Sequence, residues 1–175
     1  MSEARKPRPK GQWPNSHQVT VDKYRDDPLY PKIVAAVAKI LATSKSVAPI
    51  DVLVGMGLLE KDKLEDWRLG RVPCLEKVIH GNLAKLSRLL RILQFHAHDM
   101  HLDPCLTVYV RWGKGPKTRL RFTKTGDEPL ERAYATHLVW PGKGPFHPPR
   151  QVAVHEAPPG SVPEAPVGTQ EEHHE

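Results

Sequence analysis

The residues of this chain best suited to chemistry are basic, and they lie within residues 106–124. No acidic residue interrupts this stretch. Ammonium and guanidinium groups bind phosphates and carboxylates through charge-assisted hydrogen bonds, so the stretch predicts contact with a polyanion or with a carboxylate-rich partner. An aromatic ring beside such groups adds a surface on which a base can stack. The candidate binding residues are Tyr109, Arg111, Lys114, Lys117, Arg119 and Arg121.

Two runs with a period of two residues, LTVYVRW and TRLRFT, flank the loop GKGPK, and this pattern predicts a β-hairpin. With the loop at residues 113–117, apolar side chains of both strands share the core face. Like charges meet on the other face, which is unfavourable unless an anion lies between them. The expected register places Trp112, Val110 and Val108 opposite Thr118, Leu120 and Phe122, and Arg111 opposite Arg119 with Tyr109 beside Arg121.

A second group of reactive side chains has the residue types of a zinc site: His96, His98 and His101, followed by Cys105. On a helix His98 and His101 share a face, but His96 lies about 200° away from His98, so the group cannot surround one ion. We therefore expect neither a metal nor a cofactor.

Common catalytic motifs do not occur in the chain: there is no Walker loop, nucleophile elbow, HExxH or paired-carboxylate spacing. We therefore expect a protein that is not an enzyme. The ionisable residues left as members of a hidden site are Glu76, His80 and His137.

Helical elements must position the basic stretch. Pro31 opens a helix that ends near Thr43, and Pro49 opens a second that stops at Gly55 or Gly57. A third covers residues 61–69. The longest begins near Pro73, and its apolar stripe steps by three and four residues. This stripe comprises Leu75, Ile79, Leu83, Leu86, Leu90, Leu93, Ala97 and Met100.

After this helix come the basic hairpin, a short helix over residues 130–136 and a third strand over residues 137–140. Helices followed by strands predict an α+β fold. The order of elements also resembles that of a winged helix, but the four acidic residues in or beside residues 61–69 suit phosphates poorly. An ordinary αα-hairpin is the alternative for the glycine turn.

Most of the 18 prolines lie near the two ends of the chain, where they disfavour regular structure. We therefore expect a disordered basic arm over residues 1–28, a single α+β domain over residues 29–140, and a disordered, Pro-rich, acidic tail over residues 141–175. The tail carries five glutamates in residues 155–175, and it is expected to compete with any polyanion for the hairpin.

The two cysteines form no disulfide framework, and no signal peptide or membrane span is recognisable, so we expect a cytoplasmic location.

Three stretches, WRxGRVPxLE from Trp67, YVRWGKGPKxxLRFxKxGD from Tyr109 and ERAYATH from Glu131, resemble a group of uncharacterised bacterial hypothetical proteins. The resemblance covers about residues 48–140. It implies a bacterial origin and a shared fold, and it supplies no activity, cofactor or site residue.

Two functional hypotheses remain open. In the first, the chain is a small binding module whose basic hairpin contacts nucleic acid, with the cationic residues on phosphates and Tyr109 as a stacking group. In the second, it is a protein-interaction module that docks an acidic partner through the same face, or that forms a homodimer through the long helix. No membrane partner is expected.

Overall fold

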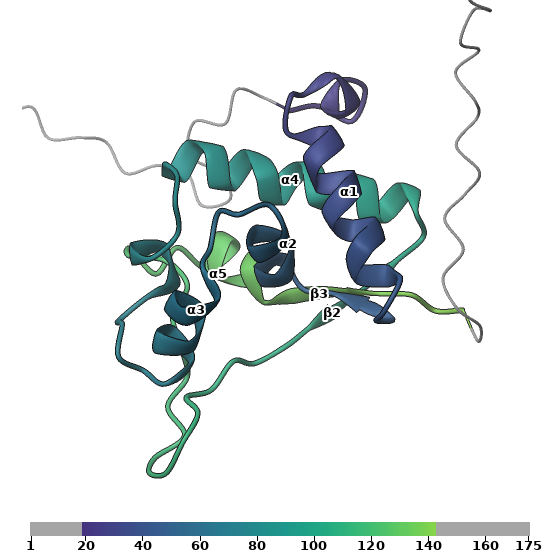
Figure 1. The fold of residues 1–175 in the computed structure, drawn as a ribbon. Helices are drawn as coiled ribbons and strands as arrows, with labels where there is room; N and C mark the ends of the chain where they lie inside the picture. Colours follow the sequence, from purple (N-terminus) through teal and green to yellow (C-terminus); the bar gives the residue numbers. More distant parts are fainter. Residues whose placement is uncertain (1–18, 143–175) are drawn as a thin grey trace, which may run out of the picture.

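The structure is a computed structural model that describes residues 19–142. The described residues form an α+β fold, as predicted, in which helices α1 and α4 lie above a small antiparallel sheet in the view of Figure 1. The helices are α1 (Tyr30–Leu41), α2 (Pro49–Gly55), α3 (Lys61–Arg68), α4 (Leu83–Asp99) and α5 (Glu128–Ala135), with short 3-10 turns at Tyr24–Asp26 and Leu75–Lys77. The strands are β1 (Ser46–Val47), β2 (Asp103–Leu106) and β3 (Thr136–Val139).

Proline sets the start of three helices. Pro31, Pro49 and Pro129 lie in the first turns of α1, α2 and α5. A first-turn proline costs little because its missing N–H would have no partner inside the helix, and its fixed φ suits the helix. The predicted helices at these places, and the predicted third helix, are confirmed to within a few residues.

The long helix α4 begins about ten residues later than predicted. A start near Pro73 is wrong, because Gly81 has a φ of 144°, which no helix accommodates. Asn82 then caps the helix: its side-chain oxygen accepts a hydrogen bond of 2.8 Å from the Lys85 N–H. The preceding stretch forms the 3-10 turn at Leu75–Lys77 instead.

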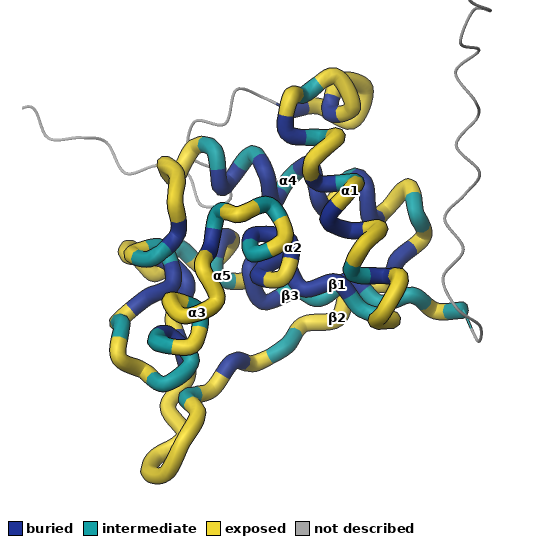
Figure 2. The backbone as a smooth tube through the Cα atoms, viewed as in Figure 1, coloured by how far each residue is buried: buried dark blue, intermediate teal, exposed yellow. Residues whose placement is uncertain are grey.

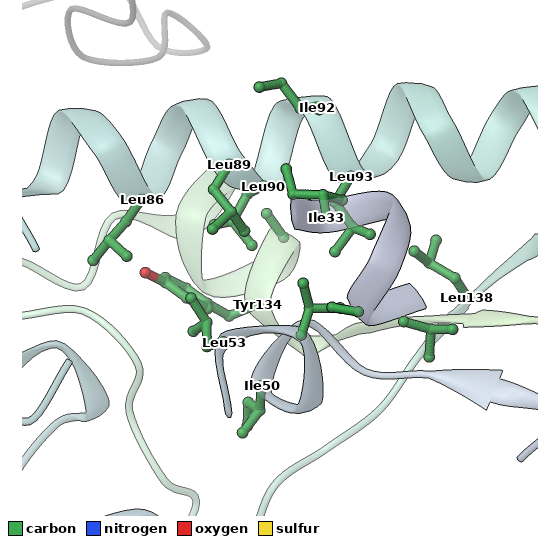
Figure 3. Close-up of a cluster of buried hydrophobic side chains, with 14 of the residues drawn as sticks. Ile33, Ile50, Leu53, Leu86, Leu89, Leu90, Ile92, Leu93, Tyr134 and Leu138 are labelled. Atoms are coloured by element: carbon green, nitrogen blue, oxygen red, sulfur yellow. The ribbon is translucent and has the colours of Figure 1, made fainter. Parts of the chain in front are cut away.

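The apolar stripe of α4 packs inside the same chain. Figure 3 shows Leu86, Leu89 and Leu90 directed from α4 toward Tyr134 on α5, and each of these side chains is buried. Helix α1 crosses α4 and contributes Ile33 to the same core. The leucines in the middle of the stripe, Leu86, Leu90 and Leu93, are buried against the core of the same chain.

The sheet has the order β1-β3-β2, with both pairs antiparallel. The predicted third strand is confirmed as β3, which lies in the centre. It pairs Leu138 with Val47 on one side and with Pro104 on the other. Strand β2 is an edge strand, and all four of its residues are exposed, so the loop that follows β2 starts from an uncovered margin of the fold.

The packed part of the chain extends further toward the N-terminus than residue 29. Val19 and Tyr24 are buried in the core. The Tyr24 hydroxyl and the Arg25 guanidinium both donate hydrogen bonds to Asp99 at the end of α4. The expectations for residues 1–18 and for the acidic tail lie outside the described residues.

Core leucines of α4 provide a test of this packing. We expect Leu89→Ala or Leu90→Ala to lower the free energy of unfolding by about 2–5 kcal/mol, because each replacement leaves a cavity in a packed core. The control is Leu83→Ala in the first turn of α4, where the residue is 39% exposed. Urea denaturation measures the difference, and equal effects at Leu83 and Leu90 would contradict the assigned core.

The buried imidazole of His96 makes stability depend on pH. Burial disfavours the charged form and lowers the pKa of His96, although Asp99 opposes this shift. Below about pH 6.5 the unfolded chain therefore binds a proton at this site more readily than the folded chain, and stability falls as pH falls. We expect His96→Gln to reduce the loss of stability between about pH 7.5 and about pH 5.5. An unchanged pH dependence in urea titrations would exclude this assignment.

Candidate functional site

Residues 107–124, here called the projecting loop, follow β2, and their tip extends away from the body of the fold (Figure 1). Residues 107–112 are its first arm and residues 118–124 its return arm. Most of the loop is exposed (Figure 2). Its two arms are joined by one bridge, Val110 with Arg119. Hydrogen bonds flank the bridge, from the Arg111 N–H to the Thr118 carbonyl (2.9 Å) and from the Leu120 N–H to the Tyr109 carbonyl (2.8 Å). The expected hairpin is thus present as a short pairing rather than as two long strands.

The register of this pairing differs by one residue from the prediction. Val110 lies opposite Arg119, where Leu120 was expected. Because side chains alternate along a strand, a shift of one residue reverses the faces of the first arm. Val108 is 62% exposed and Trp112 is 52% exposed, whereas Tyr109 is 4% exposed. The prediction of an outward Tyr109 and of inward Val108, Val110 and Trp112 is therefore wrong.

Aromatic contacts explain why Tyr109 faces inward. Its ring centroid lies 5.7 Å from that of Trp67 and 5.1 Å from that of Phe122. Its hydroxyl is hydrogen-bonded to Nε2 of His137 at 2.5 Å. Burial raises the pKa of Tyr109 to about 12, because a phenolate would lose its hydration there. Tyr109 thus anchors the projecting loop and offers no stacking surface to a ligand.

The C-terminal end of α3 holds the first arm of the loop. The Trp112 N–H donates to the Arg68 carbonyl (2.7 Å), and Nε of Arg111 donates to the Leu69 carbonyl (3.1 Å). Carbonyls at a helix C-terminus lack partners within the helix and attract cations. Arg111, a predicted phosphate ligand, is therefore occupied in positioning the loop.

Arg68 lies between two rings of the same arm. Its guanidinium carbon is 4.4 Å from the ring centroid of Tyr109 and 5.0 Å from that of Trp112. Burial lowers the pKa of Arg68. The exposed indole of Trp112 thus packs against the guanidinium of Arg68, which also packs against the Tyr109 ring. These contacts restrict the orientation of the indole.

Two carboxylates hold the return arm by its backbone. Glu131 on α5 accepts hydrogen bonds from the N–H groups of Phe122 (3.1 Å) and Thr123 (2.7 Å), and from the Thr123 hydroxyl (2.8 Å). Glu76 accepts from the Lys124 N–H (2.9 Å), and burial raises the pKa of its carboxyl. Both acids thus satisfy backbone donors of the return arm rather than its basic side chains.

Four of the predicted binding residues remain exposed on the loop: Lys114, Lys117, Arg119 and Arg121. Lys114 and Lys117 lie at the tip, where Gly113 and Gly115 adopt positive φ angles. Within residues 19–142, no carboxylate forms an ion pair with any of the four. The Lys117 ammonium donates to the Gly113 carbonyl (3.1 Å) and the Arg121 guanidinium to the Lys124 carbonyl (3.4 Å), so within the described residues these two cations meet backbone carbonyls rather than carboxylates.

A pocket of about 530 Å³ lies where the return arm meets α5. Arg119 and Arg121 line it from the loop and Arg132 from α5, while Leu106 and Leu120 supply apolar surface. The remaining lining residues are Gly126, Glu128 and Glu131. Arg132 was not predicted as a site residue, because nothing local to α5 indicates that the helix packs beside the basic stretch.

Exposed apolar side chains form a row along the first arm. Leu106, Val108, Val110 and Trp112 alternate with other residues, so they point to one side of the chain. Leu106 is 56% exposed, and this arrangement of large exposed side chains is unusual outside an interaction surface. The period of two in the sequence does indicate the row, but the expected register assigned it to the core.

The other candidate residues are not gathered into a site. His80 faces Glu60 with 3.5 Å between Nε2 and Oε1, while Glu76 and His137 have the partners described above. His96 is buried beside Tyr30, whereas His98 is exposed. Among residues 19–142 there is no group of three or more His, Cys, Asp or Glu that could hold a metal ion.

None of the described helices is both long enough and apolar enough to cross a membrane. Comparison of the chain with protein-family models, with curated proteins and with solved structures gives no match.

Glu131 is the acid on which the position of the return arm depends. We expect Glu131→Ala to lower the free energy of unfolding by about 1–3 kcal/mol, because buried donors at Phe122 and Thr123 lose their acceptor. Glu128→Ala is the matched control: Glu128 is exposed, and it lies in the same first turn of α5. Thermal or urea unfolding measures both variants, and equal effects would show that only the helix-dipole interaction is lost.

Proposed function

We propose that the chain binds nucleic acid through the projecting loop. The observation that carries this proposal is a protruding, exposed set of basic side chains that no described carboxylate neutralises. Lys114 and Lys117 at the tip, with Arg119 and Arg121 on the return arm, contact phosphates. Trp112 replaces Tyr109 as the stacking residue, since its ring is the exposed one.

Electrostatics favours this choice of ligand. A nucleic acid carries a phosphate at every nucleotide, and each phosphate that a Lys or Arg neutralises releases condensed counterions. A projecting loop brings several such residues into reach of one backbone. The acids of α3 are balanced by the bases of the same helix, KDKLEDWR, so α3 adds no net negative charge that would repel the ligand.

A protein partner is the second candidate. The exposed row of Leu106, Val108, Val110 and Trp112 favours it, because apolar side chains bury surface against other proteins. An acidic protein surface would satisfy both the row and the arginines. Binding assays with oligonucleotides distinguish the two candidates, since only a nucleic-acid module loses affinity more when the loop cations are removed than when the same number of cations is removed elsewhere.

Removal of three charges from the loop tests the proposal. We expect Lys114→Gln, Lys117→Gln and Arg119→Gln together to weaken binding of an oligonucleotide at low salt, and to reduce the slope of log affinity against log salt by roughly two to three units. Fluorescence anisotropy across a salt series measures both quantities. Residues 155–175 are removed in parallel, so that their five glutamates cannot mask a weak interaction.

A charge-matched control replaces Lys32, Lys39 and Lys45, which are exposed on α1 and just after it, by Gln. This control is expected to keep nearly the full salt slope. Equal losses in the two triple variants would mean that net charge alone attracts the ligand. No binding by the truncated parent protein at low salt would exclude nucleic acid and favour the protein partner.

A further inference from the structure

The outer face of the projecting loop carries two rows of different chemistry. The first arm presents the apolar row of Leu106, Val108, Val110 and Trp112, and the return arm presents Arg119 and Arg121. The bridge places Arg119 directly across from Val110. Apolar groups thus run along one side of this face and cations along the other.

The pocket continues both rows at the base of the loop. Leu106, the first residue of the apolar row, lines the pocket, and Arg119 and Arg121 line it as well. Arg132 adds a third guanidinium from α5. Of the two acids that line the pocket, Glu131 is held by the backbone N–H groups of Phe122 and Thr123, while Glu128 is exposed. The net effect is a cationic end to the apolar row.

We propose that this face binds single-stranded nucleic acid in preference to duplex, with bases on the apolar row and phosphates on Arg119, Arg121 and Arg132. This inference rests on the proposed function. A single strand presents phosphates on one side and unstacked bases on the other, which matches the two rows. A duplex stacks its bases inside and presents phosphates, so the apolar row would have no partner.

Trp112 is the best-formed base platform on this face. The guanidinium carbon of Arg68 lies 5.0 Å from the centroid of its ring, and the backbone N–H of Trp112 donates to the Arg68 carbonyl (2.7 Å). About half of the residue is nevertheless exposed, so the indole can accept a base without rearrangement. A ring that is held before binding loses little conformational entropy when a base stacks on it.

Charge argues against a purely apolar occupant. An apolar partner surface would cover Arg119 and Arg121 without a counter-charge, which costs desolvation energy. A second copy of the chain would bring like arginines toward one another. An anionic strand with planar apolar groups avoids both penalties.

The experiment compares a single-stranded thymidine oligonucleotide of about 12 nucleotides with a duplex of the same length at low salt, by fluorescence anisotropy. We expect the protein truncated after residue 154 to bind the single strand at least about fivefold more tightly, the lower bound of one good stacking contact. Trp112→Ala should weaken single-strand binding by roughly fivefold to a hundredfold and change duplex binding little. Trp112→Phe should restore most of the affinity.

Matched variants separate the two rows. Val108→Ser removes an exposed apolar group from the face, and Val21→Ser removes one of similar exposure, 63%, near the N-terminal end of the described chain. Only the first is expected to weaken single-strand binding. Arg132→Gln should weaken it as well, and circular dichroism checks that each variant is folded.

The outcomes are distinguishable. Equal affinities for single strand and duplex, both lost in the variant lacking Lys114, Lys117 and Arg119, would overturn this inference and leave the proposed function in place. No binding to either oligonucleotide would overturn both. A dimer in analytical ultracentrifugation that Val108→Ser dissociates would assign the apolar row to a second copy and overturn the inference.

Discussion

The burial of Trp67 sets where the return arm of the loop meets α3. The Trp67 side chain has no exposed surface, and its indole N–H donates to the Arg121 carbonyl at 2.8 Å. Its ring also packs against Phe122, with 5.2 Å between ring centroids. A buried indole N–H needs an acceptor, so this one bond fixes which residue of the return arm lies beside α3. Next to this bond, the Leu75 N–H donates to the same Arg121 carbonyl and the Glu76 N–H donates to the Phe122 carbonyl.

Much of the helical body follows from local sequence. First-turn prolines and apolar spacing predict α1, α2, α3 and α5, because these signals act within a few residues. The same apolar spacing that predicts the buried stripe of α4 also places the start of the helix too early. The apolar spacing of three and four residues continues through Gly81 and Asn82. The φ of 144° at Gly81 is not helical, however, and the side chain of Asn82 caps the N-terminus of α4.

The candidate site could be predicted only in part. The exposed cations of the loop were found because their charge is visible in the sequence. The register was not, since both faces of the first arm carry large side chains and either could be buried. The choice depends on Trp67, Phe122 and His137, which lie far from Tyr109 in the sequence, and which provide an aromatic site for it. Arg132 enters the pocket through the same long-range packing.

An edge strand that continues into exposed apolar residues also bears on how the protein behaves when concentrated. Unpaired backbone groups along β2, followed by alternating Leu106, Val108 and Val110, form a template for intermolecular β-pairing and aggregation. The cations of the return arm act as gatekeepers, because two edges cannot approach without bringing their charges together. High salt screens that repulsion, so the colloidal stability of the protein decreases as ionic strength rises.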